Sequence, residues 1–230
     1  MLIMTKLKCW MMELLYGPNS EILTWKRVGE QFYLQPDVLL IAKQLIGKKL
    51  VSCINNQTTA GIITETEAYA GETDLASHSF GGRRTRRTET MYGRGGSAYI
   101  YLCYGIHSLF NVVTNQQGIP HAVLIRGIYP VNGLEFMFQR IGHKPDLKKE
   151  GTGPGKVTKL LGLDYLMDGT DLLKSELIWI EESGFGFNPD LIRNTARIGV
   201  DYAGEDAMLP YRFIITHRDA HQELKKAGHQ

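Results

Sequence analysis

The alternation of apolar and polar residues is clearest between residues 61 and 69, where the chain reads GIITETEAY. A period of two is typical of a β-strand, and it places every second side chain on a common face. We therefore predict a strand on which two carboxylates, Glu65 and Glu67, share a face with Tyr69. An acid beside apolar residues is partly shielded from water, which raises its pKa and suits it to proton transfer. The pattern leaves one alternative open, an exposed polar face on a surface strand.

A helical period precedes this strand. Residues 36–46, PDVLLIAKQLI, carry apolar side chains at the spacing of an amphipathic helix, with Pro36 suited to the first turn and Gly47 to the position after the last. Residues 48–54 then read as a strand that turns at Asn55 and Asn56, so Glu67 stands on a rigid hairpin. Further along, the pattern predicts a hairpin over 97–114, a strand over 121–129, helices over 131–141 and 155–161, strands over 177–181 and 211–216, and a short extended segment over 197–200.

These elements predict an α+β fold in a single domain, with a mixed antiparallel β-sheet core and surrounding helices. A chain of 230 residues that is 43% hydrophobic can bury a sizeable core, and it contains no repeat or long linker. We divide it into an N-terminal extension (1–30), a domain (31–220) and a C-terminal tail (221–230). The extension has no apolar run of about 18 residues, so it predicts no transmembrane helix, and it fits a signal peptide poorly.

Cysteine usage and charge bear on the cellular compartment, on zinc binding and on anionic partners. The three cysteines are odd in number and lack CxxC pairing, which favours a reducing compartment and argues against a structural zinc site. The net charge of +2 is too small to indicate a polyanionic partner. Between His78 and Gly96, however, five arginines face the single acid Glu89, a candidate anion-binding patch whose alternative is a solvated basic loop.

Two further residues stand in unusual surroundings. Tyr104 lies beside Gly105 near the tip of the predicted hairpin over 97–114, where turn positions favour small or polar residues. Such a ring either folds back onto the core or acts as a wedge, in the way that DNA-distorting proteins insert apolar side chains between base steps. Arg126 lies among Leu124 and Ile125 in a buried-looking strand and needs a paired anion, for which Glu67 is one possible partner.

Six ordered blocks together carry a resemblance to a known family. They are ETEAY (65–69), HSFGGRRTRR (78–87), MYGRGGSAYIYLCYGIHSLFNVV (91–113), AVLIRGIYP (122–130), GPGK (153–156) and ARIGVDYAGEDA (196–207). With them the chain resembles the alkyladenine, or 3-methyladenine, DNA glycosylases from about Phe32 to His217. The resemblance implies a hairpin that protrudes and intercalates into DNA.

The resemblance also implies a role for each matching residue. Glu67 corresponds to the catalytic acid that holds and activates the attacking water, with Glu65 in support. Arg126 and the carbonyl group of Ile198 match the groups that help to hold this water. The residues that match the pocket for the extruded base are Tyr69, His78 and Tyr101, which sandwich it, Ala76, which meets its edge through the backbone, and Asn111, which crowds the amino group of guanine. The residues that match DNA contacts are Tyr104, which intercalates, and Arg83, Arg87 and Lys156, which face the backbone.

The implied function is that of a monofunctional DNA glycosylase of base excision repair. It would flip alkylated or deaminated purines out of double-stranded DNA, hydrolyse the N-glycosidic bond and leave an abasic site, because no lysine matches a nucleophile position. The family uses no metal, and we predict no cofactor, no membrane and a monomer in a bacterial cytoplasm, associated with the nucleoid, or in a nucleus. Two alternatives are a non-catalytic damaged-DNA-binding protein and a metal-dependent hydrolase that uses Glu67, Asp74 and His78, although these three lack a recognised ligand spacing.

Overall fold

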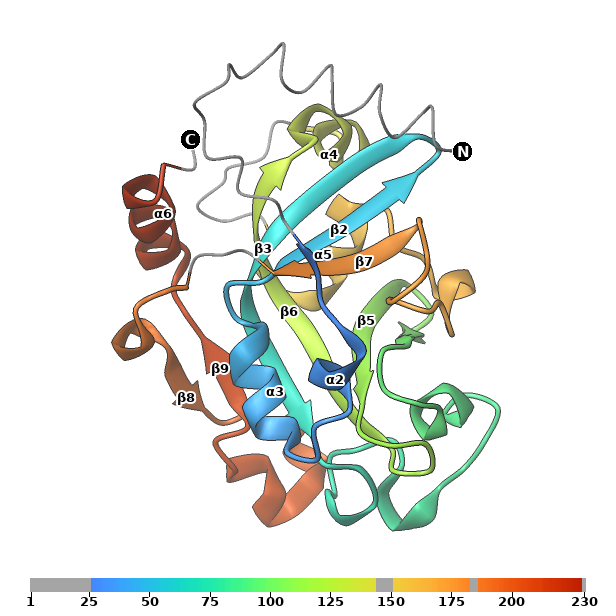
Figure 1. Ribbon diagram of the computed structural model, residues 1–230. Coiled ribbons are helices and arrows are strands. Elements are labelled where there is room, and N and C mark those ends of the chain that lie inside the picture. Colours follow the sequence, from blue (N-terminus) through green and yellow to red (C-terminus); the bar gives the residue numbers. More distant parts are fainter. Residues whose placement is uncertain (1–25, 144–150, 183–185, 229–230) are drawn as a thin grey trace.

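The strand β3 (Gln57–Tyr69) runs through the middle of the fold (Figure 1). The computed structural model describes residues 26–143, 151–182 and 186–228, so most of the predicted N-terminal extension lies outside the described residues. Both edges of β3 are paired, and residues 59–68 are all buried. The carboxylates of this strand therefore do not lie on an exposed polar face.

The strands around β3 form one curled sheet, in which every pair among the described residues is antiparallel. The first half of β3 pairs with β2 (Lys49–Ile54) and the second half with β9 (Arg212–Ile214), while β6 (His121–Asn132) follows its other edge. The order is β1-β7-β2-β3-β6-β5-β4, with β8 joined to β9. The remaining strands are β1 (Lys26–Arg27), β4 (Ala98–Cys103), β5 (His107–Thr114), β7 (Ile178–Glu182) and β8 (Arg193–Thr195).

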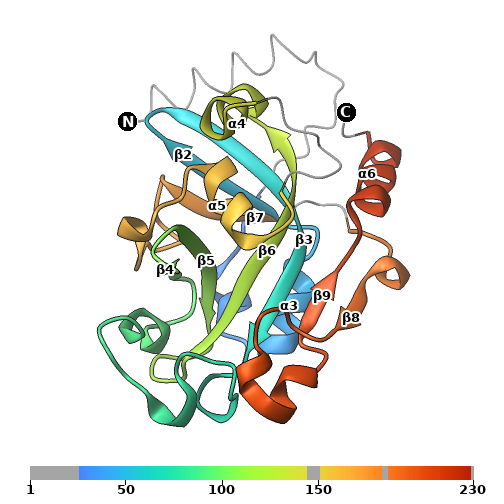
Figure 2. The same cartoon turned by 180° about the vertical axis from the view of Figure 1, so that it is seen from behind.

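Helices cover both faces of this sheet. In Figure 1 α3 lies in front of the sheet and α5 behind it, and Figure 2 shows the reverse. Each buries one apolar stripe, for example Ile41 and Leu45 of α3 and Leu160 of α5. The α-helices are α2 (Glu30–Tyr33), α3 (Val38–Leu45), α4 (Leu134–Ile141), α5 (Pro154–Leu161) and α6 (His217–Lys226). The 3₁₀ segments are η1 (Gly71–Thr73), η2 (Phe80–Gly82), η3 (Glu89–Tyr92), η4 (Tyr165–Met167), η5 (Pro189–Leu191) and η6 (Asp201–Met208).

Local chemistry explains where the predicted elements begin and end. Asp37 caps α3, because its side chain accepts hydrogen bonds from the backbone N–H groups of Leu39 and Leu40, so Pro36 lies just before the helix rather than in its first turn. Asn55 and Asn56 both adopt positive φ, as a tight two-residue hairpin turn requires, and they join β2 to β3 as predicted.

Three predicted boundaries are wrong. The helix predicted from residue 131 begins at Leu134, because β6 continues to Asn132 and Gly133 makes the turn. Residues 197–200 form a bend with Gly199 at positive φ, and the short strand nearby is β8. The strand predicted over 211–216 is confined to β9. After this strand, α6 runs to Lys226 and buries Leu224.

No helix in the described part of the chain is both long and apolar enough to cross a membrane.

Gly133 offers a test of this packing, because Gly142 at the other end of α4 serves as its control. Both glycines have positive φ, where an alanine costs about 1–2 kcal/mol. A methyl group at Gly133 would also collide with the carbonyl oxygen of Thr58, whereas Gly142 faces open space. We expect Gly133→Ala to lower the free energy of unfolding by about 3 kcal/mol or more in urea titrations, and Gly142→Ala by only the backbone cost. Equal losses would contradict this account of the α4 junction.

Candidate active site

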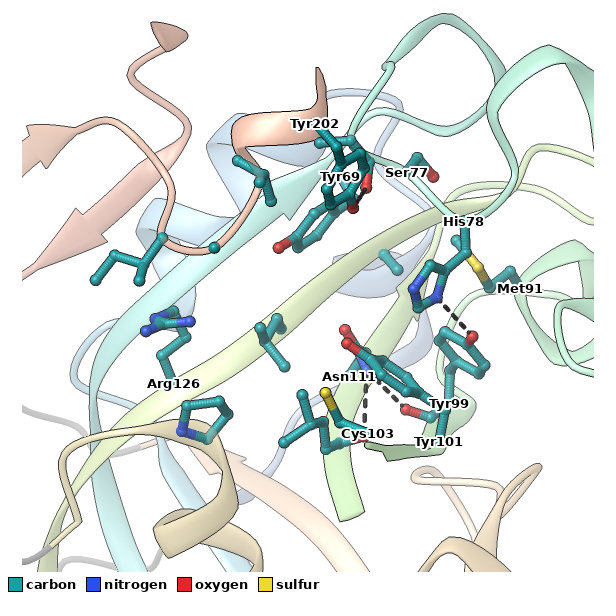
Figure 3. A pocket seen from close by; sticks show the side chains of 18 of the residues that line it. Tyr69, Ser77, His78, Met91, Tyr99, Tyr101, Cys103, Asn111, Arg126 and Tyr202 are labelled. Carbon is teal, nitrogen blue, oxygen red and sulfur yellow. Dashed lines mark hydrogen bonds between the residues drawn. The ribbon is translucent and has the colours of Figure 1, made fainter. Parts of the chain in front are cut away.

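A cavity of about 230 Å³ opens beside the C-terminal end of β3. The β4–β5 hairpin and β6 form one side of it, and the bend at Gly199 with the start of η6 forms the other (Figure 3). The predicted site residues that line this cavity are Tyr69, Ala76, His78, Tyr101, Tyr104, Asn111, Arg126 and Ile198. These residues, which come from five of the six sequence blocks together with Ala76, therefore meet at one place.

Glu67 adjoins the cavity, and its side chain is fully buried. Its Oε1 accepts a hydrogen bond of 2.8 Å from the backbone N–H of Ile198, and its Oε2 accepts one of 2.9 Å from the hydroxyl of Tyr69. Arg126 Nε lies 3.3 Å from Oε1. These three partners all line the cavity. A carboxylate offers about four acceptor positions, so one remains for a further hydrogen bond.

Burial and hydrogen bonding act in opposite directions on Glu67. Desolvation raises the pKa of its carboxyl group, whereas the charge of Arg126, the Ile198 N–H and the Tyr69 hydroxyl lower it. Desolvation is the largest of these effects, and the net result is a pKa above the ordinary value of 4.5. An acid in this state is a stronger base than an exposed glutamate once it is ionised.

Arg126 lies between two carboxylates, as its apolar sequence context predicts. Its Nε is 3.0 Å from Glu65 Oε1, closer than to Glu67. Arg212 donates to the same Glu65 oxygen at 2.7 Å. Two buried acids and two partly buried arginines thus form one cluster of opposite charges. Gly127 makes room for it, because a side chain there would press within 2.9 Å of the Glu65 Cβ.

An aromatic group faces Tyr69 across the cavity (Figure 3). The rings of His78 and Tyr101 meet edge to face with centroids 4.7 Å apart. Arg87 lies 3.4 Å from His78 Nε2, and because a guanidinium can only donate, this nitrogen is the acceptor. The proton of the neutral imidazole is then on Nδ1, which lies 3.0 Å from the hydroxyl of Tyr99. Burial, followed by the charges of Arg87 and Arg83, lowers the pKa of His78 to about 4, so the ring is neutral at pH 7.

Two predicted pocket residues have their donors occupied. The amide nitrogen of Asn111 donates to the carbonyl oxygens of Tyr99 and Leu109, which leaves its side-chain oxygen for other partners. The backbone N–H of Ala76 donates to Asp74, and the Ala76 carbonyl accepts from the hydroxyl of Tyr202. At both positions the atoms left to meet a ligand are oxygen acceptors.

The hairpin between β4 and β5 carries Tyr104 at its tip. The side chain is 92% exposed, so the alternative that it folds back onto the core is wrong. Its backbone has φ +52°, a left-handed conformation that is costly for a bulky residue. Ile106 is exposed on the same tip. The free protein thus presents apolar surface to solvent on a strained turn.

The basic loop that follows His78 is only partly neutralised. Arg84 pairs with Glu89, and Arg94 pairs with Glu30. Arg83 and Arg87, the predicted DNA contacts, are exposed, and Arg87 lies 4.8 Å from the centroid of the Tyr101 ring, beside the cavity. Lys156, the third predicted contact, is exposed in the first turn of α5.

Sequence reasoning missed a buried ion pair between Asp74 and Arg197. The guanidinium holds both carboxylate oxygens, at 2.5 and 2.9 Å, and stacks 5.0 Å from the Tyr69 ring. Arg197 stands in a block that carries the family resemblance, but no local pattern indicates a partner 123 residues away. The metal-hydrolase alternative requires Asp74 to face Glu67 and His78. Asp74 instead faces Arg197. Within the described ranges no three His, Cys, Asp or Glu side chains are grouped so that they could hold a metal ion.

Comparison with known proteins gives a consistent result. The family model described as methylpurine-DNA glycosylase matches residues 31–219. A protein of Chlamydia felis named "Putative 3-methyladenine DNA glycosylase" is 49% identical over 188 residues, which cover 81% of this chain and 95% of the relative. Proteins of the same name from Desulfitobacterium hafniense and Bacillus mycoides are 42% and 41% identical, over 83% and 79% of this chain and 95% and 92% of their own lengths.

The ion pair between Arg197 and Asp74 should matter to stability far more than a surface pair of the same type. Arg197→Met leaves the Asp74 carboxylate buried without its counter-ion, and we expect a loss of about 3–5 kcal/mol in the free energy of unfolding. Arg84→Met removes an equally short pair that is more than half exposed, and it should leave stability unchanged within error. Urea unfolding of both variants checks this. Similar losses of unfolding free energy would show that the buried pair contributes no more to stability than the surface pair.

Proposed function

The chain belongs to the methylpurine-DNA glycosylase family, and we propose that it is a DNA repair enzyme that excises damaged purines by hydrolysis of the N-glycosidic bond. The observation that carries this proposal is the buried Glu67, whose three partners all line an aromatic cavity beside an exposed hairpin. A target base inside a duplex is out of reach of such a group, so the damaged nucleotide must be extruded into the cavity.

In the proposed reaction Glu67 orients a water molecule for attack on C1′ of the deoxyribose. The water oxygen forms a bond to C1′ and passes a proton to the carboxylate, while the N-glycosidic bond breaks and its electron pair leaves with the base. The sugar passes through an oxocarbenium-like state, which the negative charge of Glu67 stabilises. The charge of Arg126 favours the ionised carboxylate and so acts against the effect of burial. The resemblance assigns the Ile198 carbonyl to the same water, next to the Ile198 N–H that holds Glu67.

The cavity suits an electron-poor purine. We propose that the base lies between Tyr69 and the pair formed by His78 and Tyr101. Stacking on aromatic side chains is worth about 1–3 kcal/mol per base, comparable with the extrusion cost of a few kcal/mol. A purine nucleotide alkylated at N3 or N7 carries a positive charge, so its base is attracted to π faces and leaves readily without protonation. A neutral His78 adds no opposing charge. The side chain of Asn111 would crowd the amino group of guanine, in line with the family role.

The hairpin and the basic loop are the proposed DNA contacts. Tyr104 would fill the gap that the extruded nucleotide leaves, since its ring already projects into solvent. Arg87 lies beside the cavity, Arg83 is exposed in the same loop and Lys156 lies in the first turn of α5, where each can meet a phosphate. Such contacts make binding sensitive to salt.

We propose that the product is an intact strand with an abasic site. Strand cleavage by a glycosylase requires an amine nucleophile that attacks C1′, and none of the described residues that line the cavity is a lysine. The competing proposal, a non-catalytic damaged-DNA-binding protein, accounts for the wedge and the arginines but does not explain why the partners of the buried Glu67 line the cavity.

Replacement of Glu67 with glutamine should abolish base release and preserve DNA binding. The amide is isosteric and cannot take a proton from water, so we expect the single-turnover rate to fall at least about 100-fold. The assay uses duplexes with one hypoxanthine or one ethenoadenine, in the presence of EDTA, followed by alkali to reveal abasic sites. Glu135→Gln, an exposed glutamate at the start of α4, is the matched control.

Retained turnover in Glu67→Gln would remove this residue from the mechanism. A natural chain that binds these duplexes and alkylated DNA but releases no base would support the binding-protein alternative instead. Strand breaks before alkali treatment would contradict a monofunctional enzyme.

The pH dependence of base release should report on Glu67 and Arg126. Protonated Glu67 cannot accept a proton, so the rate should fall as the pH is lowered, with a midpoint above 4.5 because burial raises the pKa. In Arg126→Gln the charge that favours the ionised form is lost, so the midpoint should move to higher pH. Single-turnover rates between pH 4.5 and 9 measure this shift, independently of the overall rate of the variant. An unchanged midpoint would show that Arg126 does not tune Glu67.

A further inference from the structure

Tyr202 lines the cavity, although neither the sequence pattern nor the family resemblance singles it out. It lies in η6, and its ring stands next to that of Tyr69, across the cavity from His78 and Tyr101 (Figure 3). The side chain is 70% exposed, while its hydroxyl donates a hydrogen bond of 3.0 Å to the carbonyl oxygen of Ala76. A tyrosine that exposes most of its surface and yet has a fixed hydroxyl is placed to contact a ligand.

The hydrogen bond from Tyr202 is not what holds its segment in place. Asp206 accepts a hydrogen bond of 2.8 Å from the backbone N–H of Leu75, and Arg197 donates to the Asp206 carbonyl at 3.1 Å. Together with the buried Arg197–Asp74 pair, these bonds join η6 to the loop before His78. The hydroxyl of Tyr202 can therefore be removed without release of the segment, and its function is to be sought at the cavity.

The hydroxyl of Tyr202 can accept a further hydrogen bond but cannot donate one. Its single proton is committed to the Ala76 carbonyl, so only oxygen lone pairs remain on Tyr202. The Ala76 oxygen beside it also has a second lone pair. This part of the cavity rim therefore offers acceptors, and an N–H group on an extruded base can bind there, whereas a ring nitrogen or a keto oxygen cannot.

We propose that Tyr202 is a specificity-determining residue, whose hydroxyl accepts a hydrogen bond from an N–H group of the extruded purine. This inference rests on the proposed function and adds a substrate class to it. Purines with an N–H on the exposed edge, such as hypoxanthine with its N1–H, gain a hydrogen bond from the residue. Ethenoadenine has no N–H on its ring system and gains none.

The test compares single-turnover release of hypoxanthine and ethenoadenine by the natural chain, Tyr202→Phe and Tyr129→Phe. Tyr202→Phe keeps the ring and removes the acceptor oxygen. It should slow hypoxanthine release about fivefold, the effect of one net hydrogen bond, and change ethenoadenine release less than about twofold. Tyr129→Phe is the matched control, because its hydroxyl bonds His221 outside the cavity, and it should leave the ratio of the two rates unchanged.

A Tyr202→Phe variant with an unchanged ratio, including one that slows both substrates equally, would overturn the inference while the natural chain still acts as a glycosylase. A natural chain that releases neither hypoxanthine nor ethenoadenine, nor any base from alkylated DNA, would reject the proposed function itself. Thermal unfolding of the variants identifies any effect that comes from instability.

Discussion

The fold depends on the burial of two carboxylates in the middle of its sheet. Glu65 and Glu67 stand on β3, which is paired on both edges and covered on both faces, so each charge needs a partner within hydrogen-bonding distance. Arg126 from β6 and Arg212 from β9 supply the partners. Because β6 and β9 are the two neighbours of this half of β3, the sheet order itself brings the positive charges to the acids. A different strand order would leave an unpaired charge in the core, which is strongly destabilising.

The second constraint is the pair of Arg197 with Asp74, which brings two distant loops to the same cavity. Arg197 contacts Asp74, the Tyr69 ring and the carbonyl of Asp206. The next residue, Ile198, donates its backbone N–H to Glu67. A single buried guanidinium therefore positions both an aromatic wall of the cavity and a donor to the carboxylate. This arrangement is rigid because ion pair, stacking and backbone hydrogen bonds act on neighbouring atoms of one loop.

The sequence predicts those parts of this protein that depend on residues close together in the chain. The period of two placed Glu65, Glu67 and Tyr69 on one face, and the apolar context of Arg126 predicted a buried anion. The turn at Asn55 and Asn56 and the helix after Pro36 also follow from neighbouring residues. Contacts between distant segments, such as Arg197 with Asp74 or Tyr202 with Ala76, have no local signal. The boundary at Gly133 was missed because the apolar pattern of α4 continues into β6, and only the close approach of the Thr58 carbonyl fixes the turn there.

The exposed hairpin and the buried acid differ in their exposure to water and in when their contacts form. Glu67 must lose water to become a stronger base, and it depends on donors that are already in place before a ligand arrives. Tyr104 stays hydrated on a left-handed turn, so its unburied apolar surface and its backbone strain are costs of the free protein. Burial of that ring in a duplex would recover hydrophobic free energy at the moment when a nucleotide leaves the stack. Under the proposed function, the acid would thus be fixed before DNA binds, and the free energy of DNA distortion would be left to a side chain that gains contacts only in the complex.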